Sequence, residues 1–102
     1  MSGTIMRRIV IRGRVHQVGY RAWTQHTALR HGLGGWVRNR TDGSVEALLV
    51  GSETAVQIMI EACWRGPRAA SVDALDVHEA EAAELALRAG DGGFAVLPTA
   101  ER

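Results

Sequence analysis

The order of strand-like and helix-like segments constrains the fold of this chain more than any other feature. Segments rich in β-branched residues predict strands, and apolar residues that recur every three or four positions predict helices. These patterns predict, in chain order, a strand at 7–15, a helix at 22–33, strands at 35–39 and 44–50, a helix after Ser52, a strand at 70–78 and a shorter strand at 93–98.

The second helix has the clearer pattern. Four apolar residues recur at i, i+3, i+4 and i+7, which predicts one buried face: Val56, Met59, Ile60 and Cys63. Ser52 can cap the start of this helix, and Gly66-Pro67 ends it. The first helix is less regular. We expect Ala22, Leu29 and Leu33 near its buried face, with two neighbours beside them, Trp23 and His26.

Asp42-Gly43, between the strands at 35–39 and 44–50, is a strong hairpin signal. The order is then strand, helix, strand, strand, helix, strand, with an additional edge strand. This is the split β-α-β order of ferredoxin-like folds. We therefore predict an α+β fold, a ferredoxin-like βαββαβ sandwich whose antiparallel sheet carries two helices on one face. No linker or repeat interrupts the chain, so we expect a single domain over residues 1–102, with either an extended loop or a helical turn at 79–90.

Charge is distributed unevenly along the chain, although the formal net charge is only +1. All 12 basic residues are arginines, and residues 1–41 contain eight of them but no acid. This half of the sequence is suited to attract anions. Alternatively, strands from the two halves interleave in the fold and the charges pair on the surface. The small net charge does not require a nucleic-acid partner.

Several classes of site and location are disfavoured by the sequence. The loop from Gly13 to Gly19 lacks the Lys-Ser/Thr pair of a Walker A motif, and one cysteine with scattered histidines makes a metal site improbable. Cys63, the single cysteine, is expected to be a buried and unreactive thiol. No apolar run is long enough to span a membrane, and we see no secretory signal. We therefore expect a cytoplasmic protein.

The stretch GRVHQVGYR, residues 13–21, joins the first strand to the first helix. Successive backbone N–H groups in such a loop can converge on an anion, and the start of the helix adds partial positive charge. Arg21 lies at this junction, and its guanidinium can bind two phosphate oxygens at once. The alternative is an ordinary strand–helix connection with a surface arginine.

Asn39 supports the anion-binding interpretation. It lies on a strand of the same predicted sheet and could approach the loop. Its amide can orient a water molecule or hold an oxyanion, but it is not a general base at neutral pH. Alternatively, Asn39 is a turn residue before the Asp42-Gly43 hairpin.

Together these segments resemble the acylphosphatase family, whose first motif reads approximately G-x-V-Q-G-V-G-F-R. Residues 13–21 match it, except that His16 replaces the Gln, Gln17 replaces the second Gly and Tyr20 replaces the Phe. Residues 35–46, GWVRNRTDGSVE, fit the family's second motif, G-W-V-x-N-x-x-D-G-x-V-E, throughout. The resemblance extends over roughly residues 8–78.

The resemblance implies a hydrolase that cleaves the carboxyl–phosphate bond of small acyl phosphates and releases inorganic phosphate. Arg21 would bind the phosphate and Asn39 would orient the attacking water. Backbone N–H groups of the loop would also hold the phosphate: those of His16, Gln17, Val18, Gly19 and Tyr20. The family needs no metal or cofactor and forms no covalent phosphoenzyme. We expect a monomer with no membrane or nucleic-acid partner.

The differences from the family motif at His16 and Gln17 are compatible with a second function. If the position of Gln17 needs a positive φ, a side chain there costs about 1–2 kcal/mol. His16 could add positive charge near the anion or face solvent. The alternative function is a phosphate-binding or anion-binding module with weak or no hydrolysis. An RNA-binding domain is a third interpretation, disfavoured because the chain has few aromatic residues and no RNP1-like run.

Overall fold

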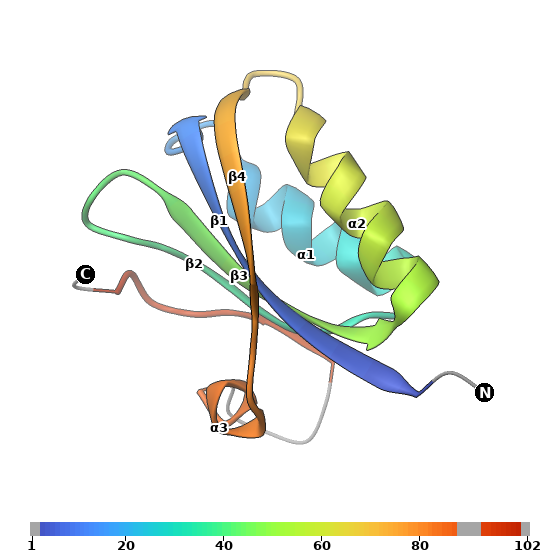
Figure 1. Ribbon diagram of the computed structural model, residues 1–102. Helices are drawn as coiled ribbons and strands as arrows, with labels where there is room; N and C mark the ends of the chain where they lie inside the picture. Colours follow the sequence, from blue (N-terminus) through green and yellow to red (C-terminus); the bar gives the residue numbers. More distant parts are fainter. Residues whose placement is uncertain (1–2, 88–92, 101–102) are drawn as a thin grey trace.

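A computed structural model describes residues 3–87 and 93–100 of the chain. Its elements, in chain order, are β1 (Thr4–Arg14), α1 (Tyr20–Arg30), β2 (Gly34–Asn39), β3 (Val45–Ser52), α2 (Glu53–Arg65), β4 (Ser71–Glu79), α3 (Ala82–Leu85) and β5 (Phe94–Val96) (Figure 1). The strands form one sheet in the order β4-β1-β3-β2-β5. Helices α1 and α2 cover one face of this sheet, as predicted (Figure 1). No helix among these residues is long and apolar enough to cross a membrane.

Among the strands of the described residues, β5 is the one whose pairing departs from the predicted antiparallel sheet. The β4–β1, β1–β3 and β3–β2 pairs are antiparallel, as expected for the ferredoxin-like order. Strand β5 instead runs parallel to β2 at the edge of the sheet. The chain reaches this edge from β4 at the opposite edge, passing through α3 on the way. The connection therefore enters β5 in the same direction as β2, which a hairpin could not achieve.

Helix α1 buries a different face from the predicted one. It begins at Tyr20 and buries side chains at i, i+4, i+7 and i+8: Tyr20, Thr24, Thr27 and Ala28. Leu29 is 53% exposed, and Leu33 is buried but lies beyond the end of the helix. Burial of Thr24 is possible because its Oγ1 donates a 2.7 Å hydrogen bond to the Tyr20 carbonyl. A polar residue satisfied by its own helix therefore occupies the buried face.

Helix α2 confirms its prediction. The four residues of the apolar stripe are all buried: Val56, Met59, Ile60 and Cys63. Ser52 Oγ accepts the Ala55 N–H at 3.1 Å and caps the helix. Near the other end, the Cys63 carbonyl has no helical donor because Pro67 lacks an N–H. The Tyr20 hydroxyl donates to this carbonyl instead and joins α1 to α2.

Burial changes the pKa of two groups here, the Tyr20 hydroxyl and the Cys63 thiol. It raises the pKa of the Tyr20 hydroxyl well above its usual range, so the hydroxyl keeps its proton and remains a donor. Burial also raises the pKa of the Cys63 thiol, to about 12. This confirms the expected buried thiol, which carries almost no nucleophilic thiolate at neutral pH.

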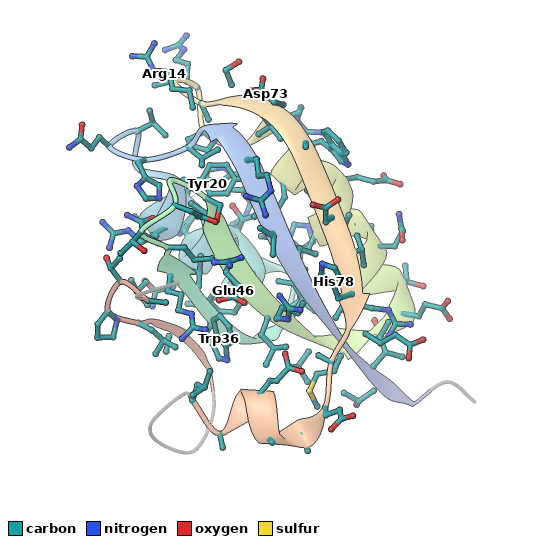
Figure 2. The ribbon with its side chains drawn as sticks, turned by 60° about the vertical axis from the view of Figure 1, so that its left-hand side comes forward. Arg14, Tyr20, Trp36, Glu46, Asp73 and His78 are labelled. Carbon is teal, nitrogen blue, oxygen red and sulfur yellow. The ribbon has the colours of Figure 1, made fainter. Side chains whose placement is uncertain are left out.

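The opposite face of the sheet holds charged pairs and α3. Glu46, which is 6% exposed, accepts hydrogen bonds from Arg38 Nε at 2.7 Å and from Arg8 Nη1 at 3.2 Å. Trp36 lies on the same face and its Nε1 donates to the Glu84 carbonyl, which fixes α3 over the sheet (Figure 2). Of the two possibilities for 79–90, the structure shows a helical turn at 82–85, and residues 88–90 lie outside the described part.

Candidate active site

The loop between β1 and α1 depends on two left-handed backbone positions, Gln17 with φ 61° and Gly19 with φ 80°. Gln17 is the one non-glycine residue with positive φ in the described part of the chain. It therefore adopts the conformation that glycine supplies more easily. Gly13 precedes the loop at φ 127°, where a Cβ would lie 2.3 Å from the Ser71 carbonyl oxygen of β4.

The backbone N–H groups of this loop lack internal partners. Gly19 caps α1 without a side-chain acceptor, and the first helical backbone bond runs from Trp23 N to Gly19 O at 3.0 Å. Within the described residues, no N–H from residue 16 to residue 22 donates a hydrogen bond. These donors, with the positive end of the helix dipole, are suited to bind an anion.

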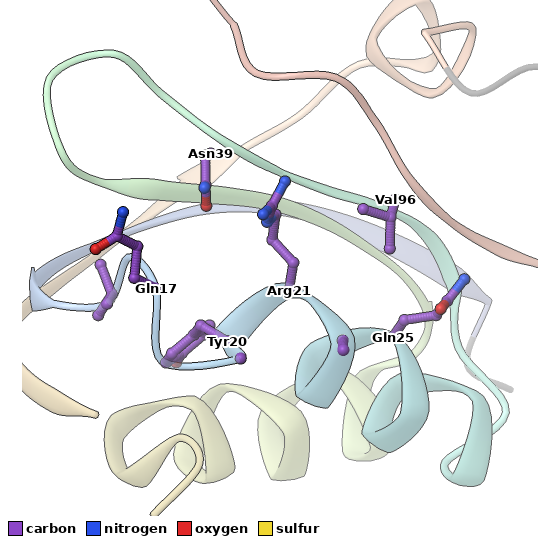
Figure 3. A pocket seen from close by; sticks show the side chains of 9 residues that line it. Gln17, Tyr20, Arg21, Gln25, Asn39 and Val96 are labelled. Carbon is purple, nitrogen blue, oxygen red and sulfur yellow. The ribbon is translucent and has the colours of Figure 1, made fainter. Parts of the chain in front are cut away.

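A pocket of about 350 Å³ opens beside this loop (Figure 3). It is lined by residues of the loop, α1, β2 and β5: Val15, Gln17, Gly19, Tyr20, Arg21, Ala22, Gln25, Asn39 and Val96. The lining includes Arg21 and three of the five predicted loop residues. His16 and Val18 do not line it, and Val18 packs against the core.

Arg21 extends from the first turn of α1 into this pocket (Figure 3). It makes no ion pair or side-chain hydrogen bond with another described residue. By contrast, Arg8, Arg12, Arg38 and Arg40 all pair with acids. The Arg21 guanidinium therefore keeps its donors available for an anion in the pocket.

Asn39 reaches the same pocket from β2. Side chains alternate along a strand, so Asn39 shares a face with Val37, which is part of the core beneath the helices. Its Oδ1 is buried and accepts no hydrogen bond from another described residue. A buried amide oxygen without a partner is costly, and a bound water or ligand group would satisfy it. The alternative role as a simple turn residue does not account for this oxygen.

His16 connects the loop to the turn between β2 and β3. Its Nε2 lies 2.8 Å from the Ser44 carbonyl oxygen, which also accepts the Arg40 N–H at 2.9 Å. Within this turn, Asp42 Oδ1 accepts from the N–H and the hydroxyl of Ser44, and these bonds lower the pKa of Asp42 to about 2. His16 is thus engaged with a turn that directly follows Asn39, and does not simply face solvent.

Comparisons with known proteins identify the family of this chain. The acylphosphatase family model matches residues 7–89. An acylphosphatase of Rhodopseudomonas palustris (strain BisB5) is 56% identical over 99 residues, which are 97% of this chain and 99% of that protein. The chain belongs to the acylphosphatase family. This confirms the predicted family and enzyme class.

Further members support the assignment. An acylphosphatase of Bradyrhizobium diazoefficiens is 50% identical over 97% of this chain and 99% of its own length. The crystal structure of acylphosphatase from Bacillus subtilis is 35% identical and has a TM-score of 0.80, covering 91% of this chain and 98% of that one. The ferredoxin-like α+β class is thus confirmed for this acylphosphatase family member.

Four pocket residues of this acylphosphatase family member were not predicted as site residues: Val15, Ala22, Gln25 and Val96. Gln25 follows Arg21 by one helical turn, so the spacing could have identified it. Val96 could not be found in this way, because only the parallel pairing of β5 with β2 brings it to the pocket. In the described residues, no cluster of His, Cys, Asp or Glu could hold a metal ion.

Proposed function

We propose that this protein hydrolyses the carboxyl–phosphate bond of small acyl phosphates by direct attack of water on phosphorus. The buried, unpartnered Oδ1 of Asn39, in one pocket with the unpaired Arg21, is the observation that carries the proposal. Both groups have unused hydrogen-bonding capacity. The Arg21 cation suits a phosphate, and the Asn39 acceptor suits a water molecule beside it.

Phosphate binding uses Arg21 and the loop. The planar guanidinium donates to two phosphate oxygens at once, and the N–H groups of residues 16–20 donate to the others. Gln17 and Gly19, with their left-handed conformations, shape the turn that presents these donors. The positive charge and the fixed N–H dipoles stabilise the charge that spreads over the phosphoryl oxygens in the transition state.

Asn39 positions the water. Its Oδ1 accepts a hydrogen bond from the water and turns the oxygen lone pair toward phosphorus. The water oxygen forms the new P–O bond, the bond from phosphorus to the acyl oxygen breaks, and a carboxylate leaves with the electron pair. A phosphate oxygen of the substrate takes the proton. A carboxylate is a good leaving group, so positioning and charge stabilisation supply most of the catalysis.

The experiment is steady-state hydrolysis of benzoyl phosphate by the wild type, Arg21→Ala and the matched control Arg14→Ala. Arg14 is exposed at the end of β1 and does not line the pocket, so the control removes the same charge outside the site. We expect Arg21→Ala to lose at least about 10²-fold in kcat/KM, and Arg14→Ala to stay within about threefold of wild type. Equal losses in the two variants would contradict the role of Arg21.

The proposal extends to partners and location. We propose that the protein acts as a monomer in the cytoplasm, without a nucleic-acid or membrane partner. A single cysteine, Cys63, which is fully buried, fits a reducing compartment. Sedimentation velocity at micromolar concentration should give the mass of one chain, 11.0 kDa.

A further inference from the structure

The pocket continues past the groups that would bind phosphate. Gln17 lies at one end, Arg21 and Asn39 lie in the middle, and Val96 and Gln25 lie at the other end (Figure 3). The volume of about 350 Å³ is that of a small-molecule site. One part of the pocket therefore remains for the rest of the substrate.

Strand β5 places Val96 in this remaining part. Phe94 is 5% exposed and belongs to the core beneath the helices, and alternation puts Val96 on the same face. The position is fixed by the pairing of Val96 with Val37 of β2 and by a 2.9 Å bond from Leu97 N to the Val37 carbonyl. Val96 is nevertheless 41% exposed, so its methyl groups are available for contact.

Helix α1 forms the other wall. Gln25 lies one turn after Arg21 on the same side of the helix, about 6 Å farther along its axis. Gln25 Nε2 donates a 2.8 Å hydrogen bond to the Phe94 carbonyl and joins α1 to β5. This hydrogen bond holds the two walls, α1 and β5, at a fixed separation. The space between them lies about one helical turn along α1 from Arg21.

We propose that Val96, with Ala22 and the methylene groups of Gln25, binds the acyl group of the substrate. This acyl subsite rests on the proposed hydrolysis and specifies its substrate class: acyl phosphates with a compact apolar acyl group, such as an aromatic ring, in preference to acetyl phosphate. Because Gln25 lies about 6 Å beyond Arg21 along α1, we expect an acetyl methyl to contact less of this wall than a longer acyl group does. An aromatic ring spans the distance and removes apolar surface from water.

The test compares benzoyl phosphate with acetyl phosphate in Val96→Ala, and measures inhibition by inorganic phosphate. Loss of two methyl groups should raise KM for benzoyl phosphate by about three- to tenfold. KM for acetyl phosphate and the Ki of inorganic phosphate should change less than twofold, because neither ligand reaches Val96. Val96→Thr keeps the side-chain shape in the strand, and it should raise KM for benzoyl phosphate at least twofold.

Val77→Ala is the matched control. Val77 is 47% exposed on β4, at the sheet edge opposite β5, and does not line the pocket. We expect its kinetics to equal those of wild type. Equal changes of KM for both substrates in the Val96 variants, or none for either, would overturn the acyl subsite while leaving the proposed hydrolysis intact. A wild type that hydrolyses neither substrate would overturn the proposed hydrolysis and the subsite with it.

Discussion

At the scale of single residues, Gln17 shows how the loop tolerates a departure from its family pattern. Its φ of 61° places it in the left-handed region, where the family motif has glycine. The side chain is exposed, so neighbouring residues do not crowd it, and the backbone adopts the left-handed turn at the cost of local strain. The left-handed turn therefore forms without glycine at this position, and we expect the loop N–H groups to bind phosphate as proposed.

Gln17→Gly is the corresponding prediction. Glycine removes about 1–2 kcal/mol of left-handed strain but adds freedom to the unfolded chain, so we expect a net gain of about 0.5–1 kcal/mol in the free energy of unfolding. Turnover of benzoyl phosphate should stay within about threefold of wild type. Urea denaturation and steady-state kinetics check the two parts. A natural protein almost without turnover that glycine activates by orders of magnitude would support the anion-binding alternative.

Tyr20 gives a second prediction at this scale. Its hydroxyl supplies the donor that the Cys63 carbonyl lacks, and Tyr20→Phe leaves that buried carbonyl unsatisfied. We expect the free energy of unfolding to fall by about 1–3 kcal/mol. The backbone N–H of residue 20 is unchanged, so kcat/KM should stay near the wild-type value. A large loss of activity in a folded Tyr20→Phe variant would show that the hydroxyl serves the site.

At the scale of elements, the end of β1 positions the loop. The register between β1 and β4 shifts between Arg12 and Gly13, and Gly13 passes close to the β4 backbone. This irregularity brings the chain out of the sheet just before the phosphate-binding turn. The approach requires an absent side chain, since the nearest atoms belong to backbone and cannot rotate away.

Gly13→Ala should therefore be costly. A Cβ at this position meets Ser71 O at 2.3 Å and forces an unfavourable φ, so we expect a loss of at least about 2 kcal/mol in the free energy of unfolding. Gly3→Ala is the control, because a Cβ there meets nothing within 4 Å. Thermal denaturation followed by circular dichroism compares the two variants. Equal melting temperatures would contradict the close approach.

At the scale of the whole molecule, folding brings the two differently charged halves of the sequence together. The ion pairs Arg8–Glu46, Arg38–Glu46 and Arg12–Asp42 each join an arginine of the first 41 residues to an acid that follows it. The interpretation that the halves interleave and pair is thus confirmed for these arginines. Arg21 does not share in this pairing, and it is the arginine at the pocket.

The two faces of the sheet should therefore respond differently to substitution. Glu46→Gln removes the carboxylate that holds Arg8 and Arg38 on the face opposite the pocket. We expect the free energy of unfolding to fall by about 1.5–3 kcal/mol, the usual value of hydrogen bonds to a charged group, with kcat unchanged. Glu53→Gln, at an exposed position, serves as the control. A reduced kcat in Glu46→Gln would contradict the separation of the two faces.

Most of the fold could be predicted from the sequence because the short-range patterns favour the same elements that tertiary packing favours. The Asp42-Gly43 hairpin and the apolar stripe of α2 appear in the structure as predicted. The predicted buried face of α1 was wrong because two threonines, Thr24 and Thr27, are buried there. Hydropathy does not register that the Thr24 hydroxyl is satisfied by the Tyr20 carbonyl. The direction of β5 was also beyond the pattern, since a three-residue strand does not specify its partner.

For the site, the sequence placed Arg21 at a helix start and Asn39 on a neighbouring strand, and the structure brings both to one pocket. Their chemical roles remain predictions. Val96 was missed because it reaches the pocket only through the parallel pairing of β5 with β2. Neither family motif, at residues 13–21 or 35–46, indicates that pairing.

The central claim is that Asn39 positions the attacking water while Arg21 and the loop bind the phosphate. The most direct test is the kcat of Asn39→Ala with benzoyl phosphate, measured together with the Ki of inorganic phosphate in a variant shown to be folded. We predict that kcat falls at least about 10²-fold while Ki stays within about threefold of wild type. A kcat within threefold of wild type would contradict the claim, because the water would then be positioned by another group.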